Sequence, residues 1–207
     1  KAAEDFGFMS LNIPERAVVE KLITQFDRSI KSIQRVDKLF FNEISGMLTE
    51  SQQRRLGRYK ISREVEAYMA LKMVGEFNRG AGVHISELYE YLHIEETPEV
   101  LQVLETYEKR YLNLAKSTYD ALTETVRIAL DMVDELEVRG LDQQALMMKF
   151  MNEEAIEDLK RRGDILLIPL QRVAFEISQL NWKTWKLLDE LLPEKEARTF
   201  QQLYFSK

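Results

Sequence analysis

One long apolar stripe in the second half of the chain constrains the fold more than any other feature of the sequence. Its members recur at steps of three and four residues, which places them on one face of an α-helix. Thr97 offers an N-cap hydroxyl, Pro98 suits the first helical position, and Gly140 suits the position after a helix end. We therefore expect one helix from Pro98 to about Arg139. Its stripe consists of Val100, Leu104, Tyr107, Tyr111, Leu114, Thr118, Leu122, Val126, Ala129, Val133 and Leu136.

A second stripe occupies the first quarter of the chain and predicts a helix from Pro14 to Met47. A further helix is expected over 50–77, until the two glycines of 78–82 favour a turn. A short helix is expected over 86–92. The stripe of the first helix consists of Val19, Ile23, Phe26, Ile30, Ile33, Val36, Phe40, Ile44 and Met47.

The remaining chain predicts one more long helical stretch, 142–191. Pro169 lies inside it and removes a backbone donor, so a kink or a break is expected nearby. Pro193 then opens a short last helix. The stripe of the long stretch consists of Leu166, Leu170, Val173, Ile177, Leu180, Thr184, Leu188 and Leu191.

These stripes predict an all-α fold. Among 207 residues there are only 8 Gly and 4 Pro, which leaves little material for turns. Long amphipathic helices cannot bury their stripes alone, so they pack on one another. We expect an elongated antiparallel bundle of helical hairpins with coiled-coil-like packing. Residues 1–13 form an N-terminal arm, and 14–207 form a single helical domain with 14–80 and 97–207 as candidate halves.

The composition narrows the range of functions. The chain has no cysteine, so disulfides, thiolate metal sites and a cysteine nucleophile are excluded. Its formal net charge of −6 argues against a nucleic-acid partner, which usually binds a basic protein. No apolar run approaches the roughly 20 residues that span a bilayer. The start at Lys1 rather than Met suggests a removed leader and therefore an exported protein, with the cytoplasm as the alternative.

The junction of the first two predicted helices carries the sequence MLTESQQRRL. Thr49 and Gln52 have the spacing of a capping box, which satisfies the first free amides of a helix. A partial echo, LLPEKEARTF, lies 144 residues later and pairs Glu194 with Arg198 as Glu50 pairs with Arg54. Capping chemistry alone explains most of this junction.

Leu48-Thr49-Glu50-Ser51-Gln52 also fits the L-T-x-x-Q motif, and here the chain resembles the LTxxQ family of bacterial periplasmic helical proteins, the Spy and CpxP type. The second copy has lost both Thr and Gln. The resemblance implies helices that wrap into a bent hairpin and ATP-independent chaperoning or envelope-stress sensing. The residues expected to form the motif and to contact a partner are Leu48, Thr49, Gln52, Arg54, Arg55 and Arg58.

Other chemistry has little support in the sequence. Glu90 and His93 have a metal-binding spacing, but a di-metal bundle needs such a pair from each of two helices. No nucleophile motif or phosphate loop is present, so we expect no catalytic residue, no metal and no cofactor. The basic residues of 54–63 are expected to form a solvated face, with an acidic partner as the alternative. Core positions are expected for Tyr107, Tyr111, Trp182 and Trp185, and the run 165–170 is either buried or a partner patch.

The sequence therefore predicts a non-catalytic helical module that binds other proteins or unfolded clients, in the manner of an exported chaperone-like or envelope-stress protein. The alternative is a structural bundle that self-associates, as a homodimer for example, and binds no client.

Overall fold

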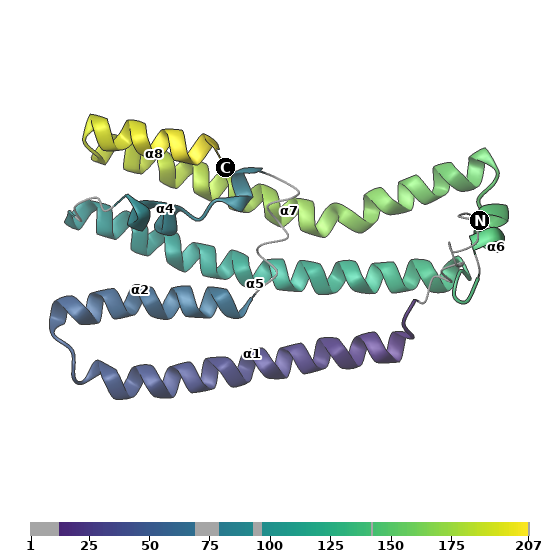
Figure 1. Cartoon of the computed structure of the whole chain (residues 1–207), viewed down its shortest axis with the longest axis horizontal. Helices are drawn as coiled ribbons and strands as arrows, with labels where there is room; N and C mark the ends of the chain where they lie inside the picture. The colour runs from purple at the N-terminus through teal and green to yellow at the C-terminus, as the bar shows by residue number, and fades with distance from the viewer. Residues whose placement is uncertain (1–12, 69–78, 93–96, 142, 207) are drawn as a thin grey trace, which may run out of the picture. The chain divides into compact units, whose positions relative to one another are not determined.

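The computed structural model describes residues 13–68, 79–92, 97–141 and 143–206, and Figure 1 shows their order. Within these ranges every regular element is a helix, so the predicted all-α bundle of long, mutually packed helices is confirmed. The elements are α1 (Arg16–Ser45), α2 (Glu50–Ala67), the 3₁₀ turn η1 (Arg79–Gly82), α4 (Ile85–Tyr91), α5 (Pro98–Glu135), α6 (Gln143–Lys149), α7 (Glu153–Leu191) and α8 (Glu194–Ser206).

Contacts divide the chain into two units, each built from two separate stretches. The first unit comprises Lys1–Phe26 and Thr123–Pro169, and the second comprises Asp27–Leu122 and Leu170–Lys207. The halves 14–80 and 97–207 stay a prediction, and residues 1–12 of the expected arm lie outside the described residues. In the part of the chain that is described, no helix combines the length and hydropathy needed to cross a membrane.

Several helix starts follow the local chemistry of the sequence. α2 begins after Thr49, whose side chain accepts from the backbone of Gln52 in a complete capping box. α5 begins at Pro98, and the Thr97 hydroxyl accepts from the amide of Val100 at 3.3 Å. Gly140 adopts a positive φ of 79°, as expected of a residue after a helix end.

Three predicted helix boundaries are wrong. α2 ends at Ala67, because Tyr68 leaves the helical region with φ −97° and ψ 67°; the rest of the predicted segment lies outside the described residues. α5 ends at Glu135, four residues early, and Glu137 takes a positive φ of 47°. The long stretch 142–191 is interrupted between α6 and α7, where Asn152 Oδ1 accepts from the amide of Ala155 at 2.7 Å.

Pro169 does not end its helix. α7 is assigned as continuous from Glu153 to Leu191 with Pro169 inside it. The break expected there is therefore absent. Pro169 is instead the last residue of the first unit, and the second unit resumes at the next residue in the sequence.

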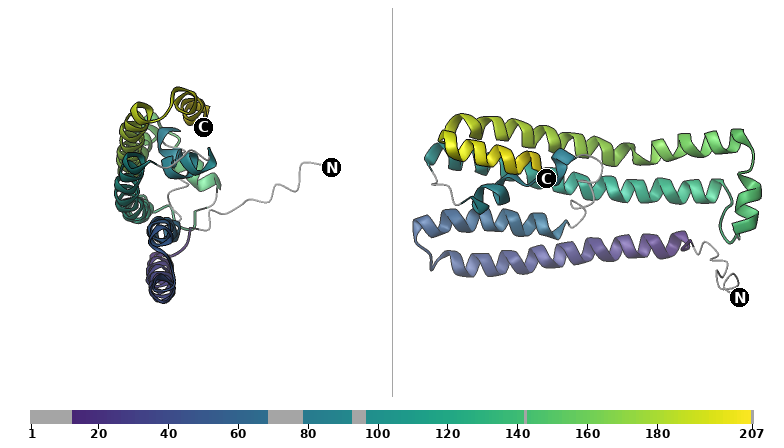
Figure 2. Two further views of the ribbon diagram at one scale, coloured as in Figure 1. Left: turned by 90° about the vertical axis from the view of Figure 1, so that its left-hand side faces the viewer. Right: turned by 45° about the horizontal axis from the view of Figure 1, so that its top comes forward.

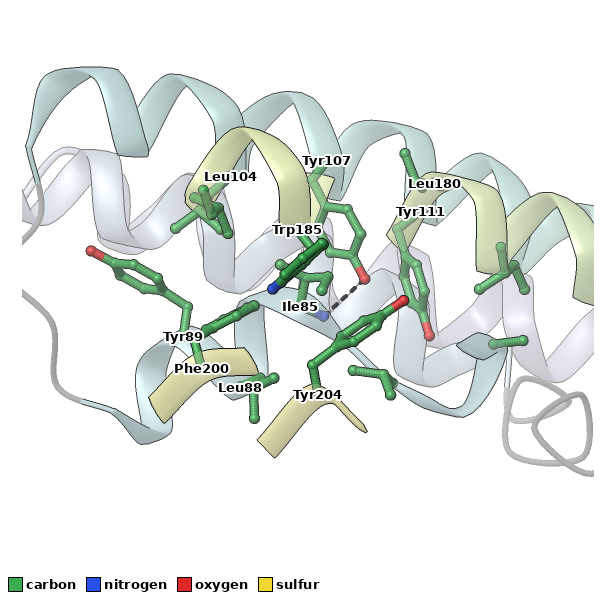
Figure 3. Packing of buried hydrophobic residues seen from close by; sticks show 14 of the residues in the cluster. Ile85, Leu88, Tyr89, Leu104, Tyr107, Tyr111, Leu180, Trp185, Phe200 and Tyr204 are labelled. Atoms are coloured by element: carbon green, nitrogen blue, oxygen red, sulfur yellow. Dashed lines mark hydrogen bonds between the residues drawn. The ribbon is translucent and has the colours of Figure 1, made fainter. Parts of the chain in front are cut away.

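The hydrophobic core lies in the second unit. It gathers side chains from α4, the first part of α5, the last part of α7 and α8 (Figure 3). α4 contacts α8, and the two lie next to each other in Figure 2. The largest fully buried members are Ile85, Tyr89, Val100, Leu104, Tyr107, Ile177, Leu188 and Phe200.

The first unit has little apolar burial. Leu130 and Val138 are its buried hydrophobic residues among those described. Exposed ion pairs join its segments instead: Arg127 Nε lies 3.2 Å from Glu20 Oε1, and Arg16 contacts Asp134 at 3.0 Å. The segments of this unit are therefore joined by exposed ion pairs and by apolar side chains that, apart from Leu130 and Val138 among the described residues, are at most half-buried.

Candidate functional site

The polar residues of the MLTESQQRRL junction satisfy the backbone of the chain itself. Gln52 Oε1 accepts from the Thr49 amide at 2.9 Å, and the Thr49 hydroxyl accepts from the Gln52 amide at 3.4 Å. Gln53 Nε2 donates to the carbonyl oxygen of Ser45 at 3.0 Å, which ties the end of α1 to the start of α2. Leu48 is half-buried. The predicted capping box is confirmed, and it occupies the two polar motif residues, Thr49 and Gln52.

Arg58 is a buried bridge between helices. Its side chain is 10% exposed, and its Nε lies 3.2 Å from Oε1 of Glu108, which is 7% exposed. A second contact, at 3.3 Å, reaches Glu90 on α4. Because both members of the main pair are buried, this residue of the predicted partner site serves to join α2 to α5. Arg55 is exposed, and the side chain of Arg54 lies outside the described residues.

The other basic residues of α2 also have neighbours within the chain. Arg63 contacts Glu66 at 2.8 Å and Asp37 of α1 at 3.7 Å. The Lys60 ammonium lies 5.5 Å from the centre of the Phe41 ring. The basic stretch 54–63 is thus spread over several separate contacts.

A buried polar network crosses the core of the second unit. The Tyr107 hydroxyl accepts from the amide of Ile85 at 3.0 Å, drawn dashed in Figure 3, and donates to Asn181 Oδ1 at 3.0 Å. Asn181 Nδ2 donates to the Val83 carbonyl at 2.7 Å. Burial raises the pKa of Tyr107 well above its ordinary value, and the neighbouring Tyr111 raises it further. The network ties the extended residues just before α4 to α5 and α7.

The aromatic residues of the sequence divide between core and surface. Tyr107, Tyr111 and Trp185 are buried as predicted. Trp182 is 41% exposed, so its predicted core position is wrong: it stacks on Trp185 with ring centres 4.8 Å apart, and the Phe205 ring meets it edge-on with ring centres 6.4 Å apart. Lys186 lies 5.1 Å from the Trp182 ring centre.

A cavity of about 640 Å³ opens on the second unit. His84 and Tyr111, whose rings lie 4.4 Å apart, form one wall, and Arg63 and Glu66 bring opposite charges that already pair with each other. Burial raises the pKa of the Tyr111 hydroxyl, with the Glu87 carboxylate as the second cause. The lining is mixed, and its ionic groups are already paired.

Metal chemistry gains no support from the described residues, among which no group of three or more His, Asp or Glu side chains could hold an ion. His93, the second member of the predicted Glu-x-x-His pair, lies outside the described residues. Within the run 165–170, Ile165 and Ile168 are close to half exposed and Leu170 is buried.

The largest departure from the sequence analysis concerns the stripe of α1, which was expected to pack. In the second unit, Val36 is 62%, Leu39 58% and Phe40 52% exposed, and Ile33 joins them at 41%. At 3.6 residues per turn these four side chains lie on one side of the helix. We call these four residues the α1 seam.

The opposite side of the same stretch of α1 makes the packing contacts. Ile30 and Phe41 are buried there, and Phe41 meets Tyr59 of α2 with ring centres 5.9 Å apart. Asp27 accepts from the Tyr119 hydroxyl at 2.8 Å, and Gln34 donates to the Tyr68 hydroxyl at 3.1 Å. α1 therefore packs through a mixed polar and apolar face, and the apolar α1 seam stays exposed.

The first unit exposes a second apolar surface that the sequence analysis missed. Met147, Met148 and Met151 are each at least two-thirds exposed and lie at the end of α6 and just after it. Methionine side chains are flexible and polarisable, and they recur on surfaces that bind varied partners. The clustering of three methionines within five residues is the signal that was available in the sequence.

Comparisons of the chain with protein-family models, with curated proteins and with solved structures gave no match.

Proposed function

We propose that this protein binds other proteins without catalysing a reaction, through apolar side chains that its helices expose, and that it acts on partly unfolded clients in a chaperone-like manner. The observation that carries the proposal is the α1 seam. Contiguous exposed apolar surface on a folded chain marks a site for another macromolecule or a membrane.

Two further features support the proposal. The exposed methionines at Met147, Met148 and Met151 offer an adaptable apolar surface in the first unit. The resemblance of Leu48-Thr49-Glu50-Ser51-Gln52 to the LTxxQ motif favours a client-binding role. Export from the cytoplasm is part of the proposal on the strength of this resemblance, and fractionation of the source cells tests it separately.

The test is suppression of client aggregation. The purified chain is mixed at near-stoichiometric ratios with a chemically unfolded client, and light scattering follows aggregation after dilution. We expect the chain to slow aggregation and Phe40→Ser to weaken this effect, because the substitution removes the largest apolar side chain of the seam.

The matched control is Phe175→Ser. Phe175 lies on α7 in the same unit, is 59% exposed against 52% for Phe40, and is not part of the seam. It removes the same chemistry elsewhere on the surface. A wild-type chain that leaves aggregation unchanged refutes client binding, and an equal loss from both substitutions refutes the seam as its site.

A further inference from the structure

One edge of the α1 seam is strongly basic. Arg28, Lys31, Arg35 and Lys38 follow one another at steps of three and four residues, so they lie along one side of α1. Arg28 and Arg35 lie next to the seam at Leu39, whereas Lys31 and Lys38 lie farther round the helix, and Lys38 lines a hollow with Gln34 and Phe41 of the packed face. A partner lying on the seam therefore meets Arg28 and Arg35 along one flank.

The cations are not neutralised by the helix that carries them. Within the described chain, none of the four forms an ion pair. Two of the three acids on this stretch of α1 are directed elsewhere, since Asp27 accepts from Tyr119 and Asp37 contacts Arg63. Glu43 is the remaining acid, one turn beyond Phe40. The exposed side of this stretch thus carries a clear excess of positive charge, although the whole chain has a net charge of −6.

We propose that the α1 seam binds an amphipathic helix of another protein, one whose apolar face is flanked by carboxylates. This inference rests on the proposed function and specifies the partner of the same surface. Apolar side chains at steps of three and four match the face of a helix laid alongside, and the basic edge selects acidic flanks. A second copy pairing through the same face would bring its own basic edge and no acidic one.

The first experiment uses two peptides. One is a fluorescent peptide of about 20 residues with leucines at steps of three and four and glutamates beside them, and the other carries lysines in place of every glutamate. Fluorescence anisotropy with the full chain measures the affinity of each. We expect the acidic peptide to bind on the order of tenfold or more tightly than the basic one, and the difference to shrink as salt is added.

Two variants locate the site. Phe40→Ser is expected to lower the affinity for the acidic peptide by roughly tenfold, the size of loss that follows removal of a buried aromatic anchor from an interface. The charge reversal Arg28→Glu with Arg35→Glu is expected to abolish the preference for the acidic peptide. Its control reverses two exposed lysines elsewhere in the same unit, Lys109 on α5 and Lys195 on α8, with an equal change of net charge.

Each contrary outcome overturns the inference. Equal binding of the two peptides, or equal effects of the two charge reversals, shows that the basic edge selects nothing. Sedimentation that finds a dimer of the wild-type chain and a monomer of Phe40→Ser assigns the seam to a second copy. If the acidic peptide fails to bind while the chain still protects clients through Phe40, the inference fails and the proposed function stands; if protection fails as well, both fall.

Discussion

Removal of one hydroxyl group from the core of the second unit gives the sharpest test of its packing. In Tyr107→Phe the amide of Ile85 loses its acceptor and Asn181 Oδ1 loses its donor, both in fully buried surroundings. An unsatisfied buried group costs about 1–3 kcal/mol, so the loss of the acceptor of the Ile85 amide alone is expected to cost about 2 kcal/mol. With a urea slope of about 2 kcal/mol per molar, the unfolding midpoint falls by about 1 M.

Tryptophan fluorescence during urea titration measures this loss, because Trp182 and Trp185 are the only tryptophans and both lie in the second unit. The matched control is Tyr111→Phe. Tyr111 packs beside Tyr107 with ring centres 5.4 Å apart, but its hydroxyl forms no hydrogen bond among the described residues. We expect its midpoint to move by less than about 0.3 M. Equal midpoints for the two variants would refute the idea that the hydroxyl network stabilises the core.

Three more outcomes follow from contacts described above. Arg58→Met is expected to cost about 3–5 kcal/mol in urea unfolding by leaving the Glu108 carboxylate buried and unpaired, and the double replacement Arg58→Met with Glu108→Leu should restore most of it. A double variant no more stable than the single one would contradict this. Thr49→Ala should cost about 1 kcal/mol by the same measurement, because it removes the cap of α2; an unchanged midpoint would contradict the capping role. Burial raises the pKa of Tyr107 and of Tyr111 above the value of about 10 that tyrosine has in the unfolded chain. The stability that each contributes is therefore complete below pH ~10, and above it the free energy of unfolding falls by about 1.4 kcal/mol per pH unit for each tyrosine. A rise in tyrosinate absorbance near pH ~10 that is lost in Tyr107→Phe or in Tyr111→Phe, while the fold is intact, would contradict the raised values.

Signals that act within a few residues were readable from the sequence. Thr97 and Pro98 predicted the start of α5, and Thr49 with Gln52 predicted the cap of α2. The missed break before α7 had a signal of the same kind, since Asn152 precedes two acids in the first turn of that helix. Local chemistry therefore predicts where helices begin, whereas the apolar stripe of this stretch starts only at Leu166 and carries no information about a break near Asn152.

The sequence does not predict in the same way which helix faces are buried. Periodicity predicts that Val36 and Phe40 share a face of α1, but it does not say whether another helix covers that face. The bond between Tyr107 and Asn181 joins residues 74 positions apart, and Arg58 meets Glu108 across 50. Such pairs depend on which helices become neighbours, and the spacing of residues along one helix does not specify that.

The sparse core of the first unit has a consequence for how the chain opens. The stability of this unit depends in part on exposed ion pairs, such as those that Asp134 forms with two arginines. A hydrogen bond from Arg139 is the main cause that lowers the pKa of Asp134, and one from Arg16 is the second. Exposed pairs contribute little and weaken with salt, so amides in this unit should exchange with deuterium through local opening well before the second unit unfolds. Circular dichroism, which senses every helix, should then record an earlier and broader transition than tryptophan fluorescence, and the gap between the two curves should widen as salt is added.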